Sequence, residues 1–218
     1  MAILTVFLVA AIVLLLVTVG EVAFRRIGFD SYEYVLILLG TLIGSTINIP
    51  VDKMRSVGPV LELQEVRVFG LYYRVPRIGY RQVSTVIAVN VGGAIIPVMV
   101  SIYLLVGHTS LLWAAAIGSI LMAILVHLVA RKVKGVGIVT PALLPPIAAA
   151  VIAYLLAPGS PAIVAYISGT LGALVGADLT NLRGIGELGA PVVSIGGAGT
   201  FDGVFLTGIV AVLLVPLL

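Results

Sequence analysis

The 218-residue chain contains no cysteine, two histidines and a single tryptophan, and only 10% of its residues are charged. Without cysteine it forms no disulfide, no thiolate metal site and no cysteine nucleophile. Two histidines argue against a histidine-rich metal centre, so we expect no metal and no cofactor. The net charge of +3 is too small to indicate a polyanionic partner, and we expect no binding to nucleic acid.

Apolar residues make up 61% of the chain, against about 45–50% in soluble domains. The mean hydropathy is +1.27. So few polar residues cannot cover a core of this size, which excludes a water-soluble protein with a single core. The composition therefore predicts a multi-pass protein of the cell membrane, with the lipid bilayer as its main partner.

Seven apolar stretches are long enough to cross a bilayer, which takes about 20 largely apolar residues per helix. In chain order they are Ala2–Phe24, Tyr32–Ile49, Ser84–Val106, Leu111–Ala130, Val136–Ala157, Pro161–Leu182 and Val192–Leu218. We therefore expect an all-α integral membrane protein with seven transmembrane helices, folded as a single polytopic domain over residues 1–218.

Basic residues in the connections predict the orientation of these helices. Ten of the 12 Lys and Arg residues fall on one side, in the connections after the second, fourth and sixth stretches. Only Arg25 and Arg26 fall on the other side. Because cytoplasmic loops carry the excess of positive charge, we expect the N-terminus to lie inside.

The connection at 50–83 is the one sizeable polar piece of the chain. Residues with high strand propensity alternate partly with polar ones from Val60 to Val75, on both sides of Gly70. This pattern predicts a small cytoplasmic β-hairpin. Its arginines and tyrosines indicate either a lipid-headgroup or regulatory site, or simply interfacial residues that follow the positive-inside rule.

Two pairs of segments resemble each other in the same order. Gly40-Thr41-Leu42 matches Gly169-Thr170-Leu171, and residues 89–94 (VNVGGA) match residues 193–198 (VSIGGA). Either the second and third stretches repeat as the sixth and seventh, or short matches recur by chance in glycine-rich helices. The glycines of 196–199 further suggest an unwound start to the seventh stretch.

Small residues recur at helical spacing in two stretches. Gly40 and Gly44 lie in the second, and Gly169, Gly172 and Gly176 in the sixth. Such faces let helix backbones approach closely in a membrane.

Five polar side chains interrupt the apolar stretches: Asp178 and Asp202, with Asn48, Asn90 and Asn181 as uncharged companions. A carboxylate near the bilayer centre costs at least about 2.5–3.5 kcal/mol on insertion scales, which makes it a functional candidate. The sixth and seventh stretches are joined by a short connection, so we expect them to be antiparallel neighbours. Their two carboxyl groups can then face each other, with Asn48 and Asn90 opposite.

A pair of carboxyl groups in one site supports several roles. Like-charge repulsion leaves one group protonated and the other ionised, as peptide hydrolysis by an aspartyl dyad requires. The same pair could bind and release protons or a cation during transport. Alternatively, each aspartate caps a helix or bonds to an asparagine in a packed bundle, without chemistry.

Four segments resemble the signature segments of a domain-of-unknown-function family of small prokaryotic polytopic membrane proteins. They are residues 42–50 (LIGSTINIP), 88–97 (AVNVGGAIIP), 176–182 (GADLTNL) and 194–208 (SIGGAGTFDGVFLTG). The resemblance covers most of the chain. It implies a membrane fold and supplies no activity.

A remoter resemblance links the chain to the presenilin-type intramembrane aspartyl proteases. It implies that Asp178 and Asp202 are catalytic, with Pro141-Ala142-Leu143 matching the Pro-Ala-Leu motif of that family. The sequence departs from the family because Asp202 follows Gly199-Thr200-Phe201 rather than Gly-x-Gly. No tyrosine precedes Asp178, and the Pro-Ala-Leu segment precedes both aspartates instead of following them.

The leading hypothesis is therefore intramembrane aspartyl-protease-like hydrolysis by Asp178 and Asp202. Its substrate would be a transmembrane peptide, contacted by Asn48, Asn90, Asn181, Pro141, Ala142, Leu143 and Gly199. Proton- or cation-coupled transport of a small ion is the second hypothesis. A non-catalytic membrane scaffold or lipid-binding protein is the third.

Overall fold

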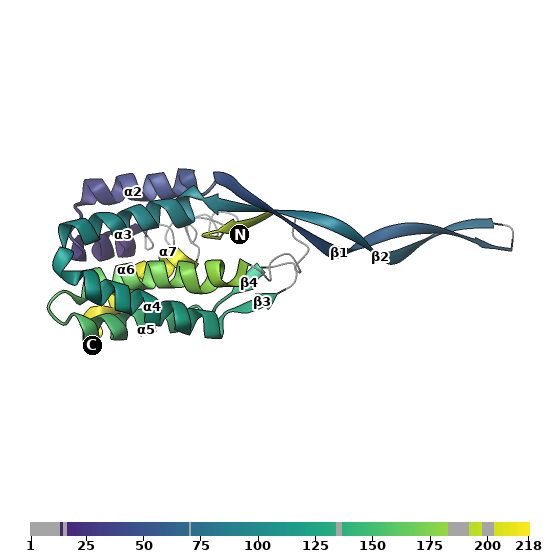
Figure 1. The fold of residues 1–218 in the computed structure, drawn as a ribbon. Coiled ribbons are helices and arrows are strands. Elements are labelled where there is room, and N and C mark those ends of the chain that lie inside the picture. The colour runs from purple at the N-terminus through teal and green to yellow at the C-terminus, as the bar shows by residue number, and fades with distance from the viewer. Residues whose placement is uncertain (1–13, 15–16, 70, 134–136, 183–191, 198–202) are drawn as a thin grey trace, which may run out of the picture.

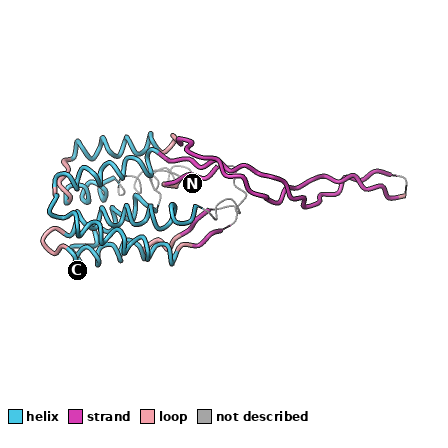
Figure 2. The backbone as a smooth tube through the Cα atoms, viewed as in Figure 1, coloured by secondary structure: helices cyan, strands magenta, loops and turns pink. Residues whose placement is uncertain are grey.

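The protein consists of a bundle of helices with a long two-stranded ribbon projecting from one end (Figure 1). This computed structural model describes residues 14, 17–69, 71–133, 137–182, 192–197 and 203–218. Helices make up the bundle, and strands gather at the end from which the ribbon leaves (Figure 2).

The bundle is built from helices that alternate in direction along the chain. A helical segment at 17–26 precedes the named helices. Those are α2 (Ser31–Gly44), α3 (Ile96–Gly107), α4 (Leu112–Val129), α5 (Leu144–Leu156), α6 (Pro161–Ala173) and α7 (Gly203–Leu214). Helix α6 packs against α3, α4, α5 and α7, and ten of its 13 residues are buried. It is the centre of the bundle, and the expected contact between the sixth and seventh apolar stretches is confirmed.

Local sequence sets where several helices begin. The Asp30 carboxylate accepts a hydrogen bond from the Glu33 backbone N–H at 2.7 Å, and the Glu33 carboxylate accepts one from the Asp30 N–H at 2.9 Å. This reciprocal cap starts α2. Helices α5 and α6 have a proline in the first turn, where its missing N–H costs no helical hydrogen bond.

Helix α4 has its small side chains inside and its large apolar ones outside. Ala115 and Gly118 are buried, whereas Trp113 is 78% and Leu128 is 76% exposed. The inner face meets Gly172 and Gly176, where a methyl group would overlap the Met122 side chain and the Ala123 carbonyl oxygen respectively. The close approach that we expected from these glycines is confirmed.

The strands form two sheets. In the larger one β2 (Leu71–Asn90) pairs antiparallel with β1 (Asn48–Val68) on one side and parallel with β5 (Val192–Ile195) on the other. The β1–β2 register runs from Asn48 opposite Asn90 to Val68 opposite Leu71, with an irregularity between Pro50 and Asp52. The smaller sheet joins β3 (Arg131–Val133) to β4 (Gly137–Val139).

The prediction of an all-α protein with seven transmembrane helices is wrong. Strands β1 to β5 occur among the described residues, and two helical stretches there, Thr109–Val129 and Pro161–Leu182, are long and apolar enough to cross a membrane. The other apolar helices are shorter. The 14 residues of α2 span about 21 Å, against a hydrocarbon core of about 30 Å. The expected stretch Ala2–Phe24 lies mostly outside the described residues.

Several predicted spans are too long because their ends on the ribbon side are extended backbone. The stretch Ser84–Val106 begins in β2 and becomes helical at Val91, through a π-helical turn at Val91–Ile95. The stretch Val192–Leu218 begins in β5. The predicted small hairpin exists but reaches into both neighbouring stretches, down to Asn48 and Asn90. Hydropathy alone does not separate an apolar strand from an apolar helix.

The two segments that resemble each other lie side by side. Gly92-Gly93 follows strand β2 in the chain, and Gly196-Gly197 follows strand β5. The two strands run parallel, with Val89 opposite Ile195. Gly196 and Gly197 have φ of +84° and +61°, the left-handed region that favours glycine. A methyl group at Gly93 would overlap the Gly196 carbonyl oxygen. The matching segments therefore meet at one backbone contact.

We predict that Gly93→Ala destabilises the fold. Because backbone rather than a flexible side chain occupies the space, the change should lower the free energy of unfolding by about 1–3 kcal/mol. The measurement is thermal unfolding in detergent micelles. Gly107→Ala is the matched control, since no atom of the described chain lies within 4 Å of a Cβ added there. Equal unfolding temperatures for the two variants would contradict the prediction.

Candidate functional site

Asp178 lies where the central helix ends. A π-helical turn, Leu174–Asp178, continues α6 and ends at this residue. Turns of this kind are frequent at functional sites. One Asp178 carboxylate oxygen accepts a hydrogen bond from the Gly196 backbone N–H at 2.7 Å. The carboxylate therefore sits between the end of α6 and the turn that follows β5.

A small cavity of about 40 Å³ opens beside Asp178. Its polar lining comes from Asp178, Thr140 and Thr207, and Pro145 and Gly203 contribute to its wall. The rest of the wall consists of apolar residues from α4, α6, α7 and the segment before α5. A cavity needs about 10–15 Å³ to hold one water molecule, so this one has room for water beside the carboxylate.

Chain neighbours of the predicted site residues line this cavity. Thr140 precedes the stretch 141–143, and Gly203 follows Asp202. The predicted substrate contacts Pro141, Ala142 and Leu143 do not line it themselves, because their side chains are exposed. Asp202 itself lies outside the described residues, as does Gly199. Asp178 is thus the described half of the expected pair, and the chain neighbour of the other half lines the same cavity.

Asn90 is the buried member of a group of hydrogen-bonded amides at the base of the ribbon, in which Asn48 is exposed. Its side-chain N–H₂ donates to the Ser45 carbonyl oxygen at 2.8 Å and to the Asn48 side-chain oxygen at 3.1 Å. Its own side-chain oxygen accepts a hydrogen bond from the Gly93 N–H at 2.7 Å. Asn90 is 0% exposed, so water cannot reach its side-chain amide. These three bonds satisfy the amide N–H₂ and oxygen instead.

Strand β5 connects the amide cluster with the carboxylate. The Ser194 hydroxyl donates to the Asn48 side-chain oxygen at 2.5 Å. Two residues further on, the Gly196 N–H donates to Asp178. We expected Asn48 and Asn90 to lie opposite the carboxylate site, and the structure links them to it through the three residues Ser194–Gly196.

Asn181 lies apart from this cluster. Its side-chain N–H₂ donates to the carbonyl oxygens of Gly176 at 3.2 Å and Ala177 at 3.0 Å, both on its own helix. These bonds satisfy carbonyl groups at the helix end. The described contacts therefore give Asn181 a capping role.

The residues quoted for the family resemblance fall within one family match. The sequence profile of a family described as "Protein of unknown function (DUF1614)" matches residues 42–214. The chain belongs to this family. No curated protein matches the chain, and no solved structure does. Our expectation of a family of unknown function is confirmed, and the likeness to presenilin-type proteases stays a prediction.

Three hydroxyl groups of this DUF1614 site were not predicted. Thr140 and Thr207 line the cavity, and Ser194 bonds to Asn48. Threonine is common in apolar helices and no spacing distinguished these two. A signal for Ser194 did exist, because it occupies the place of Asn90 in the repeated segment.

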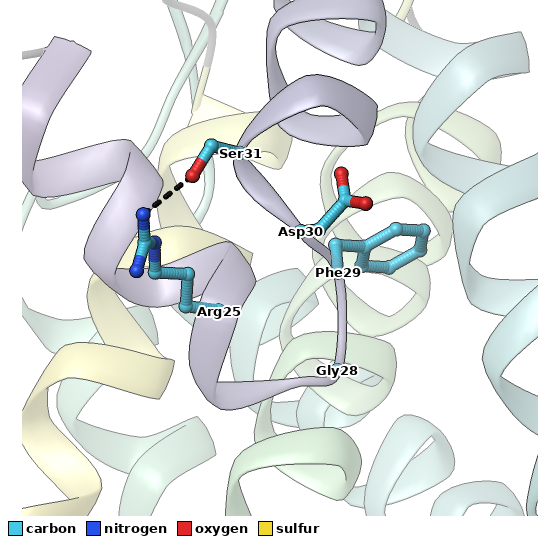
Figure 3. Close-up of a pocket in the computed structure, with 5 residues that line it drawn as sticks. All are labelled: Arg25, Gly28, Phe29, Asp30 and Ser31. Carbon is cyan, nitrogen blue, oxygen red and sulfur yellow. Dashed lines mark hydrogen bonds between the residues drawn. The ribbon is translucent and has the colours of Figure 1, made fainter.

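The opposite end of the DUF1614 bundle holds a shallow open groove of about 520 Å³, lined by Arg25, Gly28, Phe29, Asp30 and Ser31 (Figure 3). Arg25 pairs with Glu21 at 2.9 Å and donates to the Ser31 hydroxyl, which in turn donates to Glu21 at 2.8 Å. The Asp30 carboxylate caps α2. These polar groups bond to one another, and they stabilise the connection between the first helical segment and α2. In the described part of the chain, no three His, Cys, Asp or Glu residues gather as metal ligands.

We predict that Asn90→Ala destabilises the DUF1614 fold. The variant loses three hydrogen bonds at a fully buried position, and each is worth roughly 1 kcal/mol net, so the free energy of unfolding should fall by about 2–4 kcal/mol. Gln64→Ala, which removes an exposed amide from the ribbon, is the control and should change stability by less than about 0.5 kcal/mol. Unfolding in detergent measures both. A loss for Gln64→Ala as large as that for Asn90→Ala would refute a special role for the cluster.

Proposed function

We propose that the helical bundle is embedded in a membrane and crosses it more than once. Two helices are long and apolar enough to cross. The outward faces support a lipid environment, because large apolar side chains such as Tyr103, Val106, Trp113 and Leu155 are more than 60% exposed. In water an exposed apolar surface of this extent would be unfavourable, whereas lipid tails are as apolar as the side chains themselves.

We further propose that the protein is an intramembrane aspartyl-protease-like hydrolase that uses Asp178 and Asp202. One observation carries this proposal. Asp178, the residue before the Pro-Ala-Leu segment (Thr140) and the residue after Asp202 (Gly203) all line the same cavity. Three segments far apart in sequence, selected by resemblance to one class of enzyme, thus gather at one place. The cavity has room for the water that hydrolysis consumes.

In this proposal the Gly196 backbone N–H donates to the Asp178 carboxylate and orients it beside the cavity. Asp178 acts as the general base, and Asp202 carries the proton that two neighbouring carboxyl groups share. Asp178 removes a proton from water, the water oxygen attacks the peptide carbonyl carbon, and Asp202 donates its proton to the carbonyl oxygen. The C–N bond breaks as the amine nitrogen receives the proton held by Asp178. One hydroxyl of the collapsing intermediate returns its proton to Asp202, which leaves a carboxylic acid and a free amine as products.

Transport of protons or of a small cation is a second candidate, and the size of the cavity favours it. About 40 Å³ holds a water molecule or a small ion but no peptide segment, so hydrolysis requires the helices around the cavity to separate. The carboxylate and the two threonine oxygens supply the oxygen ligands that hard cations prefer.

Exchanging each aspartate for asparagine tests both candidates. In proteoliposomes containing a fluorogenic single-span peptide, Asp178→Asn and Asp202→Asn should each lower cleavage by at least about 100-fold, the lower range for loss of a general acid or base. Binding of the peptide should persist. Asp52→Asn, a matched carboxylate-to-amide change in the ribbon, should cleave like the unaltered chain.

The same preparations distinguish the alternatives. Vesicles loaded with a pH-sensitive dye report proton flux, and flux that both Asp178→Asn and Asp202→Asn abolish, without peptide cleavage by the unaltered chain, would favour transport. If Asp178→Asn and Asp202→Asn both match the unaltered chain in peptide cleavage and in proton flux, the hydrolase is refuted. A scaffold or lipid-binding role would then remain.

A further inference from the structure

The β1–β2 ribbon is much longer than the bundle needs. Its strands have 21 and 20 residues, and only Val86–Val89 of β2 gain a third strand, β5. The remaining ribbon extends away from the helices (Figure 1). A two-stranded ribbon in water is at best marginally stable, because each strand lacks a neighbour on one side and neither face is covered.

Most of both outer edges of the ribbon lacks a strand neighbour, and Pro59 on β1 and Pro76 on β2 are positions that cannot donate an N–H to one. Within the described chain, β1 has β2 as its only strand neighbour, and residues 71–85 of β2 have only β1. Edge strands with free N–H and C=O groups are templates for another strand. The ribbon also exposes apolar side chains, among them Leu63 at 66%, Leu71 at 62% and Ile78 at 64%. A partner that supplies a strand would satisfy the edge and cover part of this surface.

The two ion-pair rows of the outer ribbon have their acids on one strand and their bases on the other. Glu62 and Glu65 lie on β1, while Arg74 and Arg77 lie on β2. Arg67, also on β1, lies opposite Tyr72 and stacks over its ring. The register places Glu62 opposite Arg77 and Glu65 opposite Arg74, and the Arg74 guanidinium contacts the Glu65 carboxylate at 3.1 Å. Each strand therefore presents a charge pattern complementary to the other strand.

We infer that the ribbon is a self-association surface, in which β1 of one copy pairs antiparallel with β2 of a second copy. If two copies are related by rotation about an axis parallel to the ribbon, each residue keeps its position along that axis. Residues that lie at the same position along the ribbon then face each other across the contact. The neighbour's Arg74 then stands beside Glu65, and its Arg77 beside Glu62, which repeats the register within the chain. Pairing β2 with β2 in this arrangement would set arginine beside arginine, and pairing β1 with β1 would set glutamate beside glutamate.

This arrangement also follows from where the ribbon points. It continues the direction of the bundle helices (Figure 1), so a membrane crossed by those helices lies at its base rather than at its tip. Copies in the same membrane hold their ribbons side by side. The contact is heterologous, since β1 meets β2, and a closed ring of copies would leave no free edge. The inference is independent of the proposed chemistry at Asp178.

Cysteine cross-linking tests the pairing, and the absence of natural cysteine makes it specific. Gln64 lies opposite Val75 in the register. Full-length Q64C and V75C, carrying different tags, are mixed in detergent and oxidised. We expect at least fivefold more mixed disulfide dimer than either variant forms with itself. V106C, at the far end of α3, replaces V75C as the control and should give no mixed dimer above background.

Charge reversal with light scattering gives an independent readout. The unaltered chain should exceed the monomer mass, while E62R/E65R and R74E/R77E should each be monomeric, because like charges then meet between copies. An equimolar mixture of the two variants should regain the larger mass. A monomeric unaltered chain without cross-links would overturn the inference. The inference would also be overturned if Q64C formed disulfide dimers mainly with itself. Binding of a monomeric chain to anionic vesicles through the ribbon would overturn it as well.

Discussion

The fold depends on one close contact between two backbone turns. Strands β2 and β5 run parallel, and each is followed by a Gly-Gly pair. The two pairs are in contact, because Gly93 packs against the Gly196 carbonyl oxygen. The Gly196 N–H bonds to Asp178 on one side, and Gly93 bonds to Asn90 on the other. Any larger side chain would separate the turns. The position of the Asp178 carboxylate therefore depends on glycine at both Gly93 and Gly196, because a Cβ atom at either residue would push the turns apart.

Residues with small or absent side chains also determine how the helices of the bundle pack. Helix α6 occupies its centre because Gly172 and Gly176 let α4 approach to backbone contact. Large apolar side chains are displaced to the outer faces of α4 and of its neighbours. In a soluble protein these side chains would fill the core. Here small residues occupy the closest helix contacts, and large side chains such as Phe24, Tyr34 and Tyr166 fill the rest of the interior. Many further large apolar side chains face outward, where lipid stabilises them.

The candidate site was partly predictable from the residues themselves. Carboxylates and amides in apolar stretches are costly, which singled out Asp178, Asn48 and Asn90. Their connection was not predictable, because it runs through the backbone of β5, and a strand cannot be told from a helix in an apolar run. Thr207 was not predicted because its hydroxyl donates to the Gly203 carbonyl oxygen of its own helix, as helical threonines do whether or not they line a cavity. Thr140 was not predicted because it lies in an apolar stretch expected to be helical, whereas the structure places it between β4 and α5.

By itself the sequence determined a largely apolar chain with helices around glycine-rich faces, a β-hairpin within residues 50–83, and a few polar groups among apolar ones. Composition and local spacing suffice for these features. The tertiary structure decided where each helix begins, that β5 joins β2, and that the surroundings of residues 141–143, 178 and 203 meet at one cavity. Those outcomes depend on contacts between residues distant in sequence, and local periodicity carries no information about them.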